Sequence, residues 1–180
     1  MNRQVLLLPC STLMLALAVL FAPTGADAAP ASRNFRGHAT LFCQGALPAF
    51  ETAIRKRPLA VQNEGTSTAF VTCSFLSQGE PSFSFYNFAT AYVYVSSTSG
   101  SDIVVNCTGV AGTTTQNSEY VVRSATAPAN GNQIAIFWIA TDFAGSPDRF
   151  PSGLFSVSCQ LPPGAAINYL RAIFSEEIGT

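Results

Sequence analysis

Charged side chains are scarce in this chain of 180 residues. Asp, Glu, Lys and Arg together make up 11% of the residues, and the formal net charge is −1. The single lysine, Lys56, stands in the short basic run Arg55-Lys56-Arg57, which is typical of a solvated turn. Nucleic-acid-binding domains carry a concentrated basic patch that neutralises phosphates. The charge content therefore argues against nucleic acid as a partner.

Groups that could activate a nucleophile are nearly absent as well. His38 is the single histidine, and the sequence contains no G-x-S-x-G elbow. A serine or cysteine nucleophile needs a neighbouring base, because the neutral hydroxyl or thiol is weakly reactive. We therefore expect no catalytic residues and no cofactor, and we interpret His38 as a surface residue at the start of a strand.

Long apolar runs are lacking except at the amino terminus. Residues 5–22 are almost continuously apolar, follow the basic Arg3, and precede the small-residue sequence Ala26-Asp27-Ala28. This order is typical of a secretory signal peptide, removed after Ala28. The sequence therefore predicts a signal peptide at 1–28 and one domain at 29–180. With no second apolar run, we expect no membrane span in the mature chain and a secreted or periplasmic location.

Cysteine pairs with metal-ligand spacing are missing too. Four cysteines follow the predicted signal peptide: Cys43, Cys73, Cys107 and Cys159. An even number of widely spaced cysteines in an exported chain predicts two disulfides, for which three pairings are possible. With those thiols oxidised, His38 cannot complete a zinc site.

Alternation of apolar and polar residues is what the chain has in abundance. Within "LFSVSCQL", Phe155, Val157, Cys159 and Leu161 fall on one face. The same pattern groups Cys107 with Ile103 and Val105, and Cys73 with Val71 and Phe75. A period of two is the mark of half-buried strands. The cysteines should therefore point into a core, where Cys159 is expected to link one sheet to the other.

Further strand candidates are separated by turns rich in Gly, Pro, Ser and Asn. They are residues 38–43, 58–63, 88–96, 119–125, 132–140 and 167–174. About nine short strands predict an all-β, two-sheet antiparallel sandwich that is jelly-roll-like. Residues 49–57 carry a weak helical pattern, consistent with a short helix or an irregular crossover.

Aromatic residues alternate along residues 83–95. Tyr86, Tyr92 and Tyr94, together with Trp138 further along, are candidate ligand-facing aromatics, because exposed rings on a sheet can stack on sugars. In the other interpretation, which the composition favours, the phenylalanines are core and the tyrosines form a rim.

Acidic residues are few and lie mostly in expected turns. A glycoside hydrolase needs two facing carboxylates, for which the nine acids of the mature chain offer no obvious pair. Asp142 and Asp148 flank one loop and are a weak calcium candidate, since Ca²⁺ takes several oxygen ligands. Ordinary turn chemistry is the favoured interpretation, so no metal is expected.

The motif Cys159-Gln160-Leu161-Pro162-Pro163-Gly164, with Cys43-Gln44, Asn63–Gly65 and Cys107–Gly109, resembles small secreted bacterial disulfide-bonded β-sandwich proteins. The likeness covers most of the mature chain, although Cys73-Ser74 stands where such proteins tend to have Cys-Pro. The resemblance implies a jelly-roll-like domain and the pairing Cys43–Cys73 and Cys107–Cys159.

Three functions stay open at this point. The first is a non-enzymatic structural or interaction protein, with a glycan or protein of the cell envelope or exterior as its partner. The second is a carbohydrate-binding module that uses an aromatic strand face. The third is a small hydrolase with an acidic site.

Overall fold

A computed structural model describes residues 29–75, 87–144 and 147–178, and Pro30–Glu177 form one compact unit. The predicted signal peptide and the candidate Tyr86 lie outside the described ranges. Within those ranges, no helix has the length and apolar character needed to cross a membrane.

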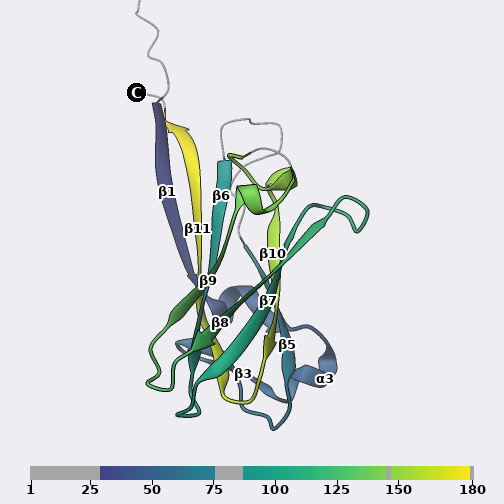
Figure 1. Ribbon diagram of the computed structural model, residues 1–180, viewed down its shortest axis with the longest axis vertical. Helices are drawn as coiled ribbons and strands as arrows, with labels where there is room; N and C mark the ends of the chain where they lie inside the picture. The colour runs from purple at the N-terminus through teal and green to yellow at the C-terminus, as the bar shows by residue number, and fades with distance from the viewer. Residues whose placement is uncertain (1–28, 76–86, 145–146, 179–180) are drawn as a thin grey trace, which may run out of the picture. The chain divides into compact units, whose positions relative to one another are not determined.

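The described residues form eleven strands in two antiparallel sheets (Figure 1). In the six-stranded sheet, the strand order is β3 (Ile54–Arg57), β4 (Ala60–Asn63), β11 (Ala165–Ile178), β6 (Asn87–Ser97) and β9 (Ile134–Ile139), and β1 (Ala29–His38) also pairs with β11. In the five-stranded sheet, the order is β2 (Cys43–Gly45), β5 (Ala69–Ser74), β10 (Phe155–Leu161), β7 (Ile103–Ala111) and β8 (Glu119–Ala127).

The strand order is that of a jelly roll. From β4 to β11 the chain passes repeatedly between the sheets, so that β4-β11-β6-β9 faces β5-β10-β7-β8. Strands distant in sequence thereby become neighbours, as in two interlocked Greek keys. The predicted all-β, two-sheet antiparallel sandwich is confirmed.

The amino-terminal part of the domain differs from the prediction. Residues 38–43 are not a strand: β1 ends at His38, and a single helical turn, α2 (Ala39–Phe42), leads into β2. The turn buries Ala39 and sets the Phe42 ring edge-on against Phe35, with 5.6 Å between ring centroids. The weak helical pattern at 49–57 is a second short turn, α3 (Pro48–Glu51), followed by the strand β3.

The core lies between the two sheets and follows the predicted alternation. Along β10, Phe155, Val157, Cys159 and Leu161 are buried, while the intervening residues face outward. On β7 the odd-numbered residues 103–111 are all buried, including Cys107. Burial of these side chains supplies the main driving force for folding, at about 25 cal/mol per Å² of apolar surface.

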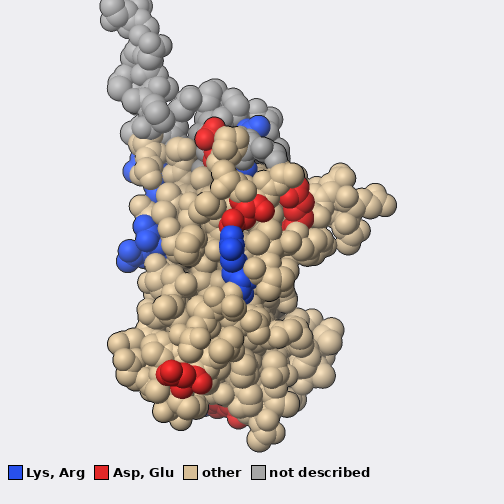
Figure 2. All heavy atoms as spheres, in the orientation of Figure 1, with Lys and Arg blue, Asp and Glu red and all other residues tan. Residues whose placement is uncertain are grey.

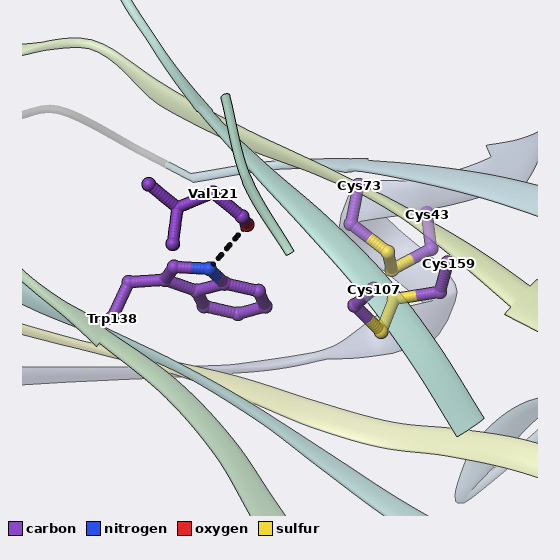
Figure 3. The surroundings of a disulfide bond; sticks show 6 residues. All are labelled: Cys43, Cys73, Cys107, Val121, Trp138 and Cys159. Carbon is purple, nitrogen blue, oxygen red and sulfur yellow. Dashed lines mark hydrogen bonds between the residues drawn. A yellow bond between two sulfur atoms is a disulfide. The ribbon is translucent and has the colours of Figure 1, made fainter. Parts of the chain in front are cut away.

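One tryptophan connects the two sheets inside this core. Trp138 on β9 is fully buried, and its indole Nε1 donates a hydrogen bond of 2.8 Å to the carbonyl oxygen of Val121 on β8 (Figure 3). Room for the indole comes from Gly109, where a Cβ atom would lie 2.7 Å from both Trp138 Nε1 and the Phe155 ring. The hydrogen bond satisfies the polar end of an otherwise apolar ring.

The disulfides join Cys43 to Cys73 and Cys107 to Cys159, the pairing that the resemblance implies. Each joins directly opposed residues of neighbouring strands, β2 with β5 and β7 with β10. The prediction that Cys159 links one sheet to the other is wrong, because all four cysteines belong to the five-stranded sheet (Figure 3). Their side chains point into the core, as the alternation predicts, but the bonds run along the sheet.

The Pro162-Pro163-Gly164 turn is fixed by the loop that follows β4. The buried amide of Asn63 donates from Nδ2 to the carbonyl oxygens of Leu161 and Ser67, at 2.7 and 2.8 Å. In return, the Gly164 N–H donates to the Asn63 carbonyl at 2.9 Å. Gly164 has φ of +79°, a conformation that favours glycine. The turn therefore acts as a structural junction.

Candidate functional site

The outward face of the six-stranded sheet carries a cluster of aromatic rings. Tyr92 and Tyr94 come from β6, Phe137 from β9 and Tyr169 from β11, and we call these four residues the aromatic surface. On β6, Ala91, Val93 and Val95 are fully buried, so alternation turns the two intervening tyrosines outward. The antiparallel register then places Phe137 opposite Tyr92, and Tyr169 opposite Tyr94.

The four rings form a row in which each contacts the next, in the order Phe137, Tyr92, Tyr94 and Tyr169. Tyr94 and Tyr169 stack with 4.1 Å between ring centroids and 14° between ring planes. Tyr92 lies 5.7 Å from Phe137 and 6.2 Å from Tyr94, centroid to centroid. Phe137, on the edge strand β9, is the most open of the four, at 51% exposed. Contacts of this kind hold the rings in fixed orientations before any ligand arrives.

A positively charged group lies within the aromatic surface. The guanidinium carbon of Arg171 lies 5.2 Å from the centroid of the Tyr92 ring, a cation–π contact. Arg171 is oriented by Asn34 on β1, whose Oδ1 accepts hydrogen bonds from Nη2 at 2.7 Å and from Nε at 3.0 Å. A neutral amide holds the guanidinium in place here, and none of the described carboxylates forms an ion pair with it.

A second arginine is close enough to affect Tyr169. Burial is the largest influence on the Tyr169 hydroxyl and raises its pKa, and the neighbouring Tyr94 acts in the same direction. The positive charges of Arg36 and Arg171 oppose that rise. Both guanidinium groups therefore lie within electrostatic range of the same ring.

An irregularity in β11 lies beside the stacked pair. The pairing of β11 with β6 shifts register between Ile167 and Tyr169, which leaves Asn168 as the extra residue of a β-bulge. The Asn168 Oδ1 atom is buried and has no hydrogen-bond partner. Bulges redirect the side chains beside them, and this one adjoins Tyr169.

The sequence identified part of this surface. Tyr92 and Tyr94 are members of it, whereas the proposal of Trp138 as a ligand-facing aromatic is wrong, because its ring is fully buried between the sheets. Alternation in residues 134–139 explains both the error and an omission: it turns Trp138 inward and the neighbouring Phe137 outward. Tyr169 lies in the predicted last strand, but its pairing with Tyr94 depends on a register that the bulge shifts, so the sequence alone does not place the two rings together.

The described carboxylates mainly support backbone turns and ion pairs. Asp142 accepts a hydrogen bond from the Ile139 N–H at 3.0 Å and is paired with Arg123. Other carboxylates accept in the same way: Glu51 from the Gly45 N–H, Glu64 from Arg57, Asp102 from the Ala129 N–H, and Glu119 from the Ala144 N–H. Each such carboxylate thus has a structural partner already.

The weak calcium candidate gains no support from the coordinates. Both carboxylate oxygens of Asp142 accept hydrogen bonds from protein donors, and Asp148 is an exposed residue of the following loop. Throughout the described part of the chain, no three or more His, Cys, Asp or Glu residues gather in a group that could hold a metal ion.

No protein-family model and no curated protein matches the chain. Among solved structures it is similar to a chain of Desmodium yellow mottle tymovirus, with a TM-score of 0.45 and 11% identity over 99% of this chain and 97% of that one. It is also similar to the family 11 carbohydrate-binding module of Clostridium thermocellum, with a TM-score of 0.36 and 11% identity over 88% of this chain and 92% of that one. These likenesses are distant and do not bear on the ligand.

Proposed function

We propose that the protein is a non-enzymatic binding protein of the periplasm or cell exterior, belonging with the small secreted β-sandwich proteins that it resembles. Its ligand is a glycan of the cell envelope or surroundings, and the aromatic surface is the contact. The observation that carries the proposal is the cluster of four touching rings on the outward face of the six-stranded sheet.

The chemistry of this surface suits a sugar ring. Pyranose rings present C–H groups that pack against aromatic faces, while their hydroxyls need hydrogen-bond partners at the edge of the contact. Here Phe137 and Tyr92 offer apolar area, and the tyrosine hydroxyls together with Arg171 offer the polar edge. The rings and the guanidinium are oriented in advance, so little side-chain entropy is lost on binding.

Two disulfides support an oxidising compartment. Such bonds form and persist in exported proteins and are rare where glutathione keeps thiols reduced. Both bonds lie at buried positions, where all four cysteines are at most 2% exposed. A binding role outside the cytoplasm also agrees with the signal peptide predicted from the sequence.

The proposal is tested by affinity electrophoresis of the oxidised protein through gels that contain soluble polysaccharides, beginning with a mixed-linkage β-glucan, a galactan and a polygalacturonate. We expect at least one polysaccharide to retard the protein. Replacing Tyr92 and Phe137 together (Tyr92→Ala, Phe137→Ala) should weaken that binding at least about tenfold, because central aromatic contacts commonly dominate binding energy.

Tyr120 provides the matched control. It is 57% exposed on β8, in the other sheet, so Tyr120→Ala removes an exposed ring of the same kind from a different face. This variant should bind as the parent does. Equal loss in the control and in the double variant, or no retardation by any polysaccharide, contradicts the proposal.

A further inference from the structure

We propose that the aromatic surface selects acidic glycans, in which uronate carboxylates are bound by Arg171 while the sugar rings pack on the neighbouring aromatics. This inference rests on the proposed glycan binding and specifies its substrate class.

The guanidinium of Arg171 retains free donors in a fixed orientation. A guanidinium has five N–H groups, and Asn34 Oδ1 accepts one from Nε and one from Nη2. The N–H groups of Nη1 and the second N–H of Nη2 remain, and together they form a fork that matches the two oxygens of a carboxylate. Because Asn34 fixes the other edge of the group, the free fork is preorganised.

The charge of Arg171 is not paired with any carboxylate among the described residues. Among the residues that the structure describes, ion pairs join Arg57 to Glu64 and Arg123 to Asp142, and neither involves Arg36 or Arg171. Both of these arginines nonetheless act electrostatically on Tyr169. In Figure 2 the coloured atoms along the edge formed by β1, the strand that carries Arg36, are those of Lys and Arg.

Several described residues near the rings carry no charge. Opposite Tyr92 and Tyr94 on β9 lie Phe137 and Ala135, and flanking positions carry Gln62 on β4 and Asn34 on β1. Glu64, which follows β4, is neutralised by a bidentate pair with Arg57. A carboxylated sugar therefore meets attraction at this surface, with no described unpaired carboxylate to repel it.

Uronate geometry fits the position of Arg171. In a uronic acid the carboxylate projects from the rim of the pyranose ring, so a ring packed on an aromatic face presents its charge at the edge of that contact. The guanidinium of Arg171 lies over the Tyr92 ring, 5.2 Å from its centroid, so a sugar packed on the neighbouring Phe137 or Tyr94 ring presents its edge to the free fork. A lysine would supply the charge without the planar fork, so an arginine is better suited to binding both oxygens of a carboxylate.

The test compares polygalacturonate with its fully methyl-esterified form, which has the same backbone without the charge. Isothermal titration of the oxidised protein should give at least tenfold tighter binding to the acidic polymer, with affinity falling as salt rises. Arg171→Gln should remove about tenfold of the affinity for the acid and lower the affinity for the ester by a much smaller factor, because the glutamine amide can still bond sugar hydroxyls. Arg149→Gln, which removes an equal charge from an exposed loop, is the matched control and should bind like the parent.

The outcomes separate this inference from the function on which it rests. Equal binding of acid and ester, or binding of the acid that is insensitive to Arg171→Gln, overturns the acidic selectivity and leaves glycan binding standing. Absence of binding to both polymers also overturns it, while retardation by the neutral β-glucan or galactan would still support the proposed function.

Discussion

The two sheets of the sandwich present outer faces of opposite character. The outer face of the six-stranded sheet carries the four touching rings and Arg171. The outer face of the five-stranded sheet carries, on its central strands, mostly small uncharged polar side chains together with the exposed Phe70 and Val104: Thr72 and Ser74 of β5, Ser156, Ser158 and Gln160 of β10, and Asn106 and Thr108 of β7. The row of four contacting rings with an arginine over it belongs to the six-stranded sheet.

The disulfides belong to the sheet that does not carry the aromatic surface. Both disulfides lie in the five-stranded sheet, and within the described ranges none is found in the six-stranded sheet. The sheet that carries the aromatic surface is instead held by its hydrogen-bonded ladders, by core packing and by the Trp138–Val121 hydrogen bond to the other sheet. Because the disulfides and the aromatic surface belong to different sheets, mutations can alter one without touching the other.

Removing a disulfide should cause the largest change in stability. The Cys107–Cys159 bond closes a loop of 52 positions and the Cys43–Cys73 bond one of 30. By loop entropy, Cys107→Ala with Cys159→Ala should lower the free energy of unfolding by about 4 kcal/mol, and Cys43→Ala with Cys73→Ala by about 3.5 kcal/mol. Small domains have about 5–15 kcal/mol in total, so urea unfolding at 25 °C resolves both losses.

Measuring glycan binding by the two cysteine variants shows whether the disulfides affect stability alone or binding as well. The molecules that remain folded should keep the glycan affinity of the parent, because the disulfides lie in the sheet opposite the aromatic surface. A double variant within 1 kcal/mol of the parent would contradict the loop-entropy estimate. A folded variant with lost affinity would contradict the separation of the two faces.

A middle-sized effect is expected from Trp138→Phe. The substitution keeps an aromatic ring in the core but removes the donor to the Val121 carbonyl oxygen, leaving a partly buried acceptor without this partner. We expect a loss of about 1–3 kcal/mol in the free energy of unfolding. Phe137→Leu, one residue earlier on the same strand but 51% exposed, should change stability by less than about 0.5 kcal/mol. Similar losses in both variants would contradict the inward and outward assignment on β9.

Much of the fold could be predicted because alternation reports directly on burial. The inward residues of β5, β7 and β10 were identified correctly, since each strand has one face on the core. Alternation does not say which strands are neighbours. It therefore could not show that the cysteine pairs lie within one sheet, and the strands β1, β2 and β3 have patterns too short or too polar to detect.

Half of the aromatic surface could be predicted for the same reason. Tyr92 and Tyr94 alternate with buried valines on one strand, whereas Phe137 and Tyr169 join them only through pairing with β9 and β11. Arg171 depends on the same register and on Asn34, 137 positions earlier in the chain. Contacts between residues so distant in sequence leave no local signal.

The smallest expected effect concerns the ion pair between Arg57 on β3 and Glu64, which follows β4. Hydrogen bonding from Arg57, above all, holds the pKa of the exposed Glu64 carboxyl below its usual range. Since this pKa is lower in the folded than in the unfolded chain, the pair stabilises at neutral pH, and its small contribution is lost as the pH falls through the folded-state pKa. NMR titration should show the lowered value, and Arg57→Gln should raise it; an unchanged pKa would contradict the pairing.

The arrangement of the disulfides along the chain also bears on how the protein matures. The two covalent loops, 43–73 and 107–159, neither overlap nor nest. In a chain that emerges amino terminus first, Cys73 meets an oxidant with Cys43 as the one earlier cysteine outside the predicted signal peptide, well before Cys107 appears. Oxidation in order of emergence therefore yields the native pairing directly, and the protein should acquire its bonds without the help of a disulfide isomerase.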